Sequence, residues 1–128
     1  MRGDRGAAVV EFTLVSILLV GLFLAVLQVG LVLHARNVMV AAAQEGARFA
    51  ANADRSPADG VARTQEALSG SLGADLVART DVSPLPLTTS PNGARVVGIR
   101  VSGPAPWVFR AVGRLTITVE GHALEEGP

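Results

Sequence analysis

The chain contains no cysteine, no lysine and few aromatic residues. Without cysteine, it has neither disulfide bonds nor thiolate metal sites. Its 11 basic residues are all arginines and balance 11 acidic residues, so it offers no polycationic surface for nucleic acid. With four Phe and one Trp, its core must be built mainly of Val, Leu, Ile and Ala. We therefore expect no nucleic-acid partner, and a small domain that gains stability from its core, a membrane or other proteins.

Patterns typical of catalysis and metal binding are also missing. The two histidines, His34 and His122, have no ligand partner at a metal-binding spacing. The sequence shows no Ser/His/Asp or Cys/His arrangement, and its glycines do not follow the phosphate-loop pattern. We expect no enzymatic activity, no cofactor, no metal and no small-molecule substrate.

One long segment carries no charge. Residues 12–33 form a run of 22 residues whose polar members are Thr13, Ser16 and Gln28. As a helix, this run is about 33 Å long, close to the thickness of the hydrocarbon core of a bilayer. The run predicts a single transmembrane helix. Because an unpaired amide is costly in lipid, Gln28 is expected to face another protein segment.

A cleaved secretory signal is the main alternative for this segment. Such signals have an apolar region of only about 7–15 residues, and the conceivable cleavage site at 41–43 lies well past the apolar run. Arg2 and Arg5 precede the span. They favour a cytoplasmic N-terminus, with the C-terminal part of the chain outside the cell membrane.

The head of the chain places a carboxylate directly before this span. Residues 5–12 read Arg-Gly-Ala-Ala-Val-Val-Glu-Phe, so Glu11 adjoins the apolar run. A charge costs roughly 2.5–3.5 kcal/mol at the bilayer centre and less near its surface. One interpretation is an interfacial Glu11 that complements the helix dipole, since the first turns of a helix favour an anion.

The spacing supports a second interpretation. A basic leader, a glycine, four small apolar residues, a glutamate and an aromatic residue before a long apolar helix resemble the type IV prepilin processing site. In that family a membrane-embedded prepilin peptidase cuts after the glycine. The resemblance implies cleavage between Gly6 and Ala7, with Glu11 and Phe12 as mature residues five and six. It also implies that Glu11 pairs with the N-terminal amine of a neighbouring subunit, a contact in which two groups costly in lipid meet.

The resemblance narrows to one family. "RGAAVVEFTLV", an apolar span and then "AAAQEGARFAA" resemble the TadE-like family of the tight-adherence (Tad) pilus system, over residues 5–52. The similarity continues weakly into "LTITVEGHALEE". The family comprises minor pilins or pseudopilins, which implies a prepilin peptidase, other pilins and a pilus assembly platform as partners. The alternative function is a membrane-anchored domain that binds a ligand or wall component, with no role in a pilus.

The apolar helix is expected to continue beyond the membrane, because residues 34–53 are rich in helix formers. The resemblance then divides the chain into a cytoplasmic leader at 1–6, a helix at 7–52 and an extracytoplasmic domain at 53–128. Small side chains let helices approach closely, and they share one face with a methionine. That face packs against either neighbouring subunits or the chain's own domain, and it consists of Met39, Ala43, Gly46, Ala47 and Ala50.

On the same helix, Glu45 and Arg48 are spaced to pair. After a break, Ser56 and Pro57 predict the cap and first residue of a second helix of about 14 residues, which ends near 69–73. Alternating patterns predict strands at 75–83, 95–102 and 114–123, with a proline-rich loop at 84–91 and a turn at 92–93. The expected class is α+β, with about three antiparallel strands packed on the long helix in a pilin-like arrangement.

The segment 107–110, Trp-Val-Phe-Arg, lies between the last two predicted strands. A lone Trp in a small domain is often part of the core. Tryptophan is also enriched where proteins meet the membrane surface. Both interpretations of Trp107 stay open from the sequence.

Overall fold

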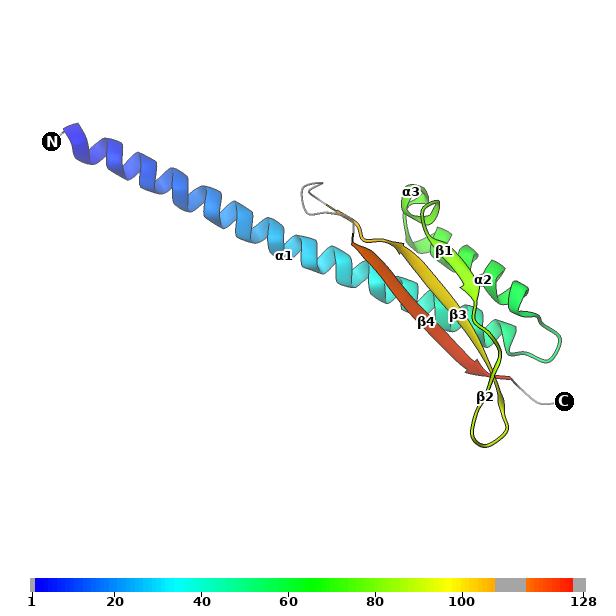
Figure 1. The fold of residues 1–128 in the computed structure, drawn as a ribbon. Coiled ribbons are helices and arrows are strands. Elements are labelled where there is room, and N and C mark those ends of the chain that lie inside the picture. The colour runs from blue at the N-terminus through cyan, green and yellow to red at the C-terminus, as the bar shows by residue number, and fades with distance from the viewer. Residues whose placement is uncertain (1, 108–114, 126–128) are drawn as a thin grey trace.

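The structure, a computed structural model, describes residues 2–107 and 115–125. It consists of one long helix, α1, with a small α+β domain packed along the C-terminal part of that helix (Figure 1). The predicted α+β class and pilin-like layout are confirmed. The N-terminal part of α1 extends away from the domain (Figure 1).

Helix α1 spans Arg2–Ala50, which is 49 residues and about 73 Å. No proline occurs before Pro57, and the Ala, Leu and Val that fill the segment support an uninterrupted helix. The observed helix begins before the predicted start at residue 7, since the leader residues also adopt helical geometry. It ends two residues before the predicted 52, where Arg55 N–H donates to the Asn52 carbonyl in a turn, 3.0 Å.

Helix α2, Pro57–Ser71, folds back along α1. Ser56 is its N-cap, as predicted, and forms a capping box with Asp59. The Ser56 hydroxyl accepts from the Asp59 N–H at 3.3 Å, and the Asp59 carboxylate accepts from the Ser56 N–H at 2.8 Å. This exchange satisfies backbone donors that the first turn of a helix leaves free.

The strand predicted at 75–83 is wrong in its first part. Ala74–Val77 form a short helix, α3, and only Asp81–Pro84 form a strand, β1. Arg79 pairs with Asp75 one turn away, an i,i+4 contact that a strand does not allow. Leu76 and Val77 are both half-buried. A strand would place these two neighbours on opposite faces, whereas one helical turn lets both face inward. One turn is too short to show a helical period in the sequence.

The sheet has four antiparallel strands, one more than predicted. Its central strand, β3, spans Arg95–Pro104. One edge of β3 pairs with β4, Thr116–Leu124. The other edge pairs with β2 at the start of β3 and with β1 further along it. Strand β2 is only Thr88–Thr89 and lies inside the predicted proline-rich loop. Two residues between prolines are too few to produce a periodic signal.

Helices α1 and α2 lie side by side across one face of this sheet, α1 against β4 and α2 against β1 (Figure 1). The core lies between the helices and the sheet and contains no charged side chain among the described residues. Its central members are Met39, Ala43 and Ala47 of α1, Leu68 of α2, and Ile99, Val101, Ile117 and Val119 of the sheet.

Candidate functional site

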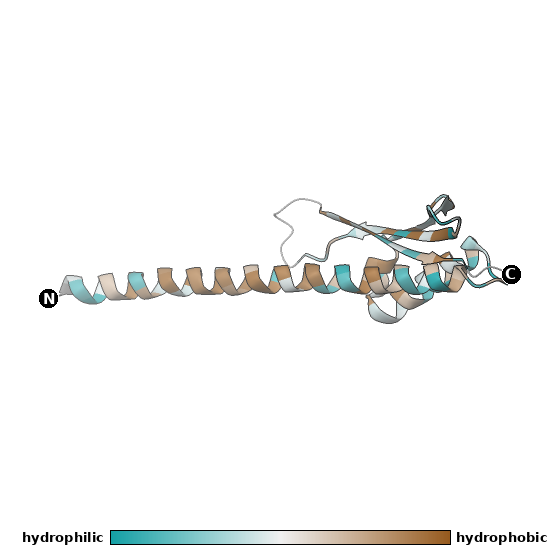
Figure 2. Ribbon diagram, turned by 90° about the horizontal axis from the view of Figure 1, so that it is seen from below, coloured by the Kyte–Doolittle hydropathy of each residue, from teal (hydrophilic) through white to brown (hydrophobic). Residues whose placement is uncertain are grey.

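The candidate site lies on α1, whose two parts have different surroundings. We call residues 2–27 the bare half and residues 28–50 the covered half. In the bare half most apolar side chains are exposed. Figure 2 shows this part of the helix as a mainly hydrophobic segment that projects from the domain. The most apolar 18-residue window of the helix has a mean hydropathy of 2.7, and none of it is buried. The helix is therefore long and apolar enough to cross a membrane.

The predicted processing and assembly residues lie at the free end of the bare half. A methyl group on Gly6 would meet no other atom within 4 Å. Ala7 and Glu11 are exposed, and Phe12 is 73% exposed. The structure thus brings no other part of the described chain near these four residues. Thr13 donates its hydroxyl to the Val9 carbonyl at 2.8 Å, so this polar group is satisfied within the helix.

The covered half buries the small face that the sequence singled out. All five of its predicted residues are buried in the structure: Met39, Ala43, Gly46, Ala47 and Ala50. Of the two possible partners for this face, the structure shows the chain's own domain. On one side, α2 approaches so closely that a methyl group on Gly60 would lie 2.7 Å from the Gly46 carbonyl oxygen.

On the other side of this face, strand β4 touches the backbone of α1. A methyl group on Gly121 would lie 2.5 Å from the Gln44 nitrogen, so only glycine fits there. Sequence reasoning did not single out Gly60 or Gly121. For Gly121 a signal existed. It follows Ile117 and Val119 in the alternating pattern, and a glycine at an inward position of a strand often marks a close backbone approach.

Charged side chains tie the rim of the covered half to α2. Arg63 of α2 donates to the carboxylates of Glu45 at 2.5 Å and Glu66 at 3.0 Å. The hydrogen bond to Glu45 has the largest effect on the pKa of Arg63, followed by the bond to Glu66, and both raise that pKa above its usual value. The predicted pairing of Glu45 with Arg48 is therefore replaced by a contact with α2, because Arg63 reaches Glu45 across the helix pair.

Gln28, where the covered half begins, contacts the loop that follows β3. Its side-chain Nε2 donates to the Pro106 carbonyl at 2.7 Å. The expectation that Gln28 faces another protein segment is confirmed, and that segment belongs to the same chain. The next residue, Trp107, is half-buried against the core. Phe109 and Arg110, which were considered together with Trp107, lie outside the described residues.

The comparisons with known proteins single out the same helix. The family model described as TadE-like protein matches residues 6–48. The match identifies residues 6–48 as a TadE-like segment. The match covers the predicted motif around Gly6 and Glu11, all of the bare half beyond residue 5 and most of the covered half. It does not reach the C-terminal strand, where a weak resemblance was expected. No curated protein and no solved structure matches the chain.

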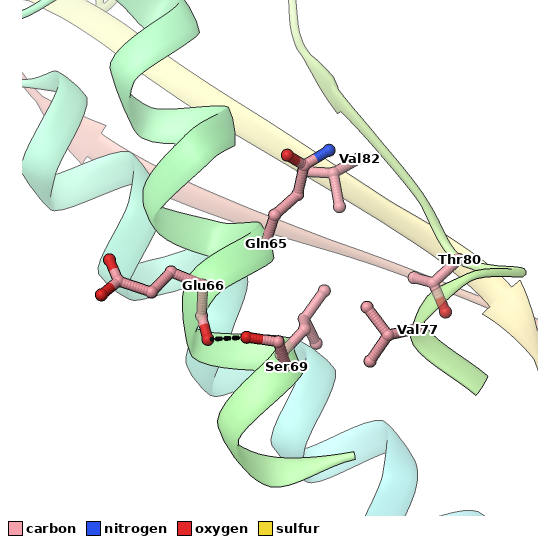
Figure 3. A pocket seen from close by; sticks show the side chains of 7 residues that line it. Gln65, Glu66, Ser69, Val77, Thr80 and Val82 are labelled. Carbon is pink, nitrogen blue, oxygen red and sulfur yellow. Dashed lines mark hydrogen bonds between the residues drawn. The ribbon is translucent and has the colours of Figure 1, made fainter. Parts of the chain in front are cut away.

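The TadE-like family is a pilin family of the Tad pilus assembly context, and its members are normally not enzymes. A shallow hollow of about 420 Å³ lies between α2, α3 and β1 of the domain beside the TadE-like segment (Figure 3). Its hydroxyls are already used: Ser69 donates to the Glu66 carbonyl and Thr80 to the Leu76 carbonyl, both at 2.8 Å. Both hydroxyl protons in the hollow are therefore donated within the fold.

The two histidines lie on different elements of the fold. His34 is exposed on α1, and His122 is exposed on β4, 3.9 Å from the Glu120 carboxylate. Within residues 2–107 and 115–125, no group of three or more His, Cys, Asp or Glu side chains is placed to hold a metal ion. The feature of the described chain that carries the most functional information is the TadE-like helix.

Proposed function

We propose that this chain is a minor pilin or pseudopilin of a Tad pilus assembly system. In this proposal it enters the cell membrane with its N-terminus in the cytoplasm and its domain outside. A prepilin peptidase cuts after Gly6. The mature chain then binds other pilins through α1 and also binds the pilus assembly platform. The single observation that carries the proposal is the TadE-like match, which begins at Gly6 and includes the exposed apolar segment of α1.

The isolation of the motif supports processing. A peptidase must reach the Gly6–Ala7 bond, and nothing in the described chain covers Gly6. The domain sits on the covered half, more than 20 residues further along the helix. At a rise of about 1.5 Å per residue, that separation exceeds about 30 Å. The domain and the cleavage site therefore occupy different environments when the bare half lies in a bilayer.

The chemistry of the cut end supports docking. Cleavage removes Arg2 and Arg5 and leaves an ammonium group on Ala7. Both this ammonium and the Glu11 carboxylate are costly in lipid, and each lowers the other's cost when they pair. Glu11 is exposed in the structure and accessible to a second subunit.

The core argues against ordinary signal cleavage. A cut near residues 41–43 would remove Ala35 and Met39, which are 2% and 1% exposed. It would also expose the residues of the sheet and α2 that pack on them. The packing of the domain on the covered half supports a mature chain that keeps this half of α1.

The test is the N-terminus of the protein made in its native host with its peptidase, read by intact mass. We expect loss of residues 1–6 from the wild type and an uncut chain in Gly6→Leu. Gly3→Leu is the matched control, because Gly3 is equally exposed on the same helix and should leave cleavage unchanged. Glu11→Gln should be recovered folded but fail to enter pili.

Two other results of this measurement, and one result of a separate anchor replacement, contradict the proposal. A mature wild-type protein that keeps Met1 rules out processing. A mature N-terminus near residue 43 indicates a secretory signal instead. If an unrelated membrane anchor replaces residues 1–33 without loss of function, the chain is a membrane-anchored binding domain with no pilus role.

A further inference from the structure

The domain contacts α1 at a level that lies inside the predicted span. Gln28 donates to the Pro106 carbonyl at 2.7 Å, and Gln28 precedes the end of the apolar run, Leu33, by five residues. Five residues of helix correspond to about 7.5 Å. If residues 12–33 occupy the hydrocarbon core, Pro106 lies below the level at which the helix leaves that core.

This end of the domain is held firmly against the helix. Ala105 is 3% exposed, and its N–H donates to the Leu115 carbonyl at 2.8 Å. Trp107 and Val32 are both half-buried against the core. The Pro106 carbonyl therefore belongs to a packed part of the fold, and its position relative to α1 is fixed by contacts on both sides.

The chemistry of the two ends of the domain differs. The end near Gln28 presents Pro106, Trp107 and an exposed Leu115, and no charged side chain occurs in residues 101–107. The opposite end carries the charged α1–α2 turn, 52–56, and the Arg95–Glu125 ion pair. Arg110 and Arg114 lie in the segment between Trp107 and Leu115, so residues 101–107, and not the whole end, carry no charge. Uncharged residues beside an apolar helix and charged residues at the far end of the domain match the polarity of a membrane surface.

We propose that the Ala105–Trp107 end of the domain, together with Leu115, rests at the boundary between the headgroups and the outer part of the acyl chains on the domain's side of the bilayer. The partner of this surface is lipid, and the Gln28–Pro106 hydrogen bond sets its depth. The bond also removes the cost of placing an amide and a carbonyl in lipid. Trp107 suits this layer, since its ring is apolar and its indole N–H is polar. The proposal rests on α1 crossing a membrane and not on any role in a pilus.

The test uses Trp107, which is the only Trp in a chain without Tyr, so the long-wavelength emission of the protein reports on that residue. The full chain is reconstituted in phosphatidylcholine vesicles whose lipids carry bromine near the headgroup, near the end of the acyl chain, or not at all. We expect bromine near the headgroup to quench Trp107 most. Equal emission in all three vesicles, or stronger quenching by the deep bromine, would overturn the interfacial position.

A pair of cysteine variants gives a second reading that does not depend on the tryptophan. The chain has no native cysteine, and Leu115 and Leu124 flank or end the same strand with exposures of 49% and 58%. In vesicles, Leu115→Cys should react much more slowly than Leu124→Cys with a membrane-impermeant maleimide. When the protein is denatured in detergent without vesicles, the two reaction rates should become similar. Equal rates in vesicles would place both ends of β4 in water and contradict the proposal.

The role of the hydrogen bond is tested by Gln28→Leu, which keeps the volume of the side chain but loses the donor. Quenching of Trp107 by headgroup bromine should fall in this variant. Thr13→Val is the control, because the Thr13 hydroxyl bonds within its own helix and its loss should leave quenching unchanged. Wild-type quenching in Gln28→Leu would show that the bond does not set the depth of the domain.

Discussion

The two halves of α1 are built from similar residues but are used differently. Both are rich in Ala, Val and Gly, and both are regular helix. In the bare half, methyl groups added at Gly3, Gly6 and Gly21 would meet nothing within 4 Å. In the covered half, a methyl group on Gly46 would lie 2.6 Å from the Gly60 carbonyl oxygen. Glycine is therefore a neutral choice at these three positions and a requirement of packing at Gly46.

This difference bears on how a pilin would use its helix. The small face of the covered half is occupied by α2 and β4, so it offers no close approach to another subunit. The bare half is not covered by the domain, and in the proposed span it contacts only lipid until another subunit binds. In the proposed pilus, contacts between α1 helices are therefore made mainly through the bare half, where Glu11 also lies.

The largest expected effect comes from adding a side chain where the covered half meets α2. Gly46→Val forces branched carbon atoms into Thr64 and the Gly60 carbonyl, neither of which has room to move. We expect a loss of more than about 4 kcal/mol, enough to abolish cooperative unfolding of a small domain. The measurement is denaturant unfolding of the full chain in detergent micelles, followed by Trp107 fluorescence.

Gly21→Val is the matched variant in the bare half. It adds the same atoms to the same helix at a site with no neighbours, so the unfolding midpoint of the domain should not change. If both valine variants destabilise the domain equally, the two halves are not distinguished by packing and the comparison fails.

A smaller effect is expected from emptying a filled site. Met39 is 1% exposed, and Met39→Ala leaves a cavity between α1 and the sheet. Buried methionine-to-alanine changes cost about 2–5 kcal/mol, and we expect about 3 kcal/mol here. Leu22→Ala, on a side chain that is 61% exposed, should leave the free energy of unfolding of the domain unchanged. A comparable loss for Leu22→Ala would mean that the bare half contributes to the folded domain.

Most of the helices could be predicted from the sequence because their signals are local. The uncharged run at 12–33 and the absence of proline before Pro57 define α1, and the Ser56 cap defines the start of α2. The boundary between α3 and β1 is not predicted, since a four-residue helix is too short to show a helical period in the sequence. Strand β2 was missed because its two residues are held by pairing with β3, which no local pattern shows.

The site divides in the same way. The motif around Gly6 and Glu11 is a string of adjacent residues, so the sequence carries it completely. The partner of the small face was undecided, because it depends on Gly60 and Gly121, which are distant in sequence from Gly46 and Ala43. The contact between Gln28 and Pro106 joins residues 78 positions apart, and only the cost of a bare amide in lipid predicted that Gln28 needs a partner.

The cover over α1 can also be weakened without touching α1. Ser56→Ala removes the N-cap of α2 and should cost about 1 kcal/mol. Asp59 contributes to the same capping box, and the hydrogen bond from the Ser56 N–H, followed by that from its hydroxyl, lowers the pKa of Asp59. Because the pKa of Asp59 is lower in the folded state than its ordinary value of about 4, its charge stabilises the fold at pH values above about 4. This contribution is lost as the pH falls through the pKa of the folded state.

Asp59→Asn should therefore be less stable than the wild type at neutral pH, and the difference should shrink as the pH falls below about 4. Unfolding midpoints measured across this range give the comparison. A difference that stays constant with pH would show that the Asp59 charge does not stabilise the start of α2.

The smallest expected effect is at the exposed ion pair between the two helices. Glu45→Gln and Arg63→Gln each remove one side of a contact that is about half exposed, so water and salt screen most of its strength. In a double-mutant cycle the coupling between them should be smaller than the loss in Ser56→Ala, and it should shrink further in high salt. A coupling larger than the loss in Ser56→Ala that also falls in high salt would mean that charge, and not the close approach at Gly46 and Gly60, holds α2 on the covered half. The expected order, with packing at the glycines first and the ion pair last, follows from contacts that are buried in one case and solvated in the other.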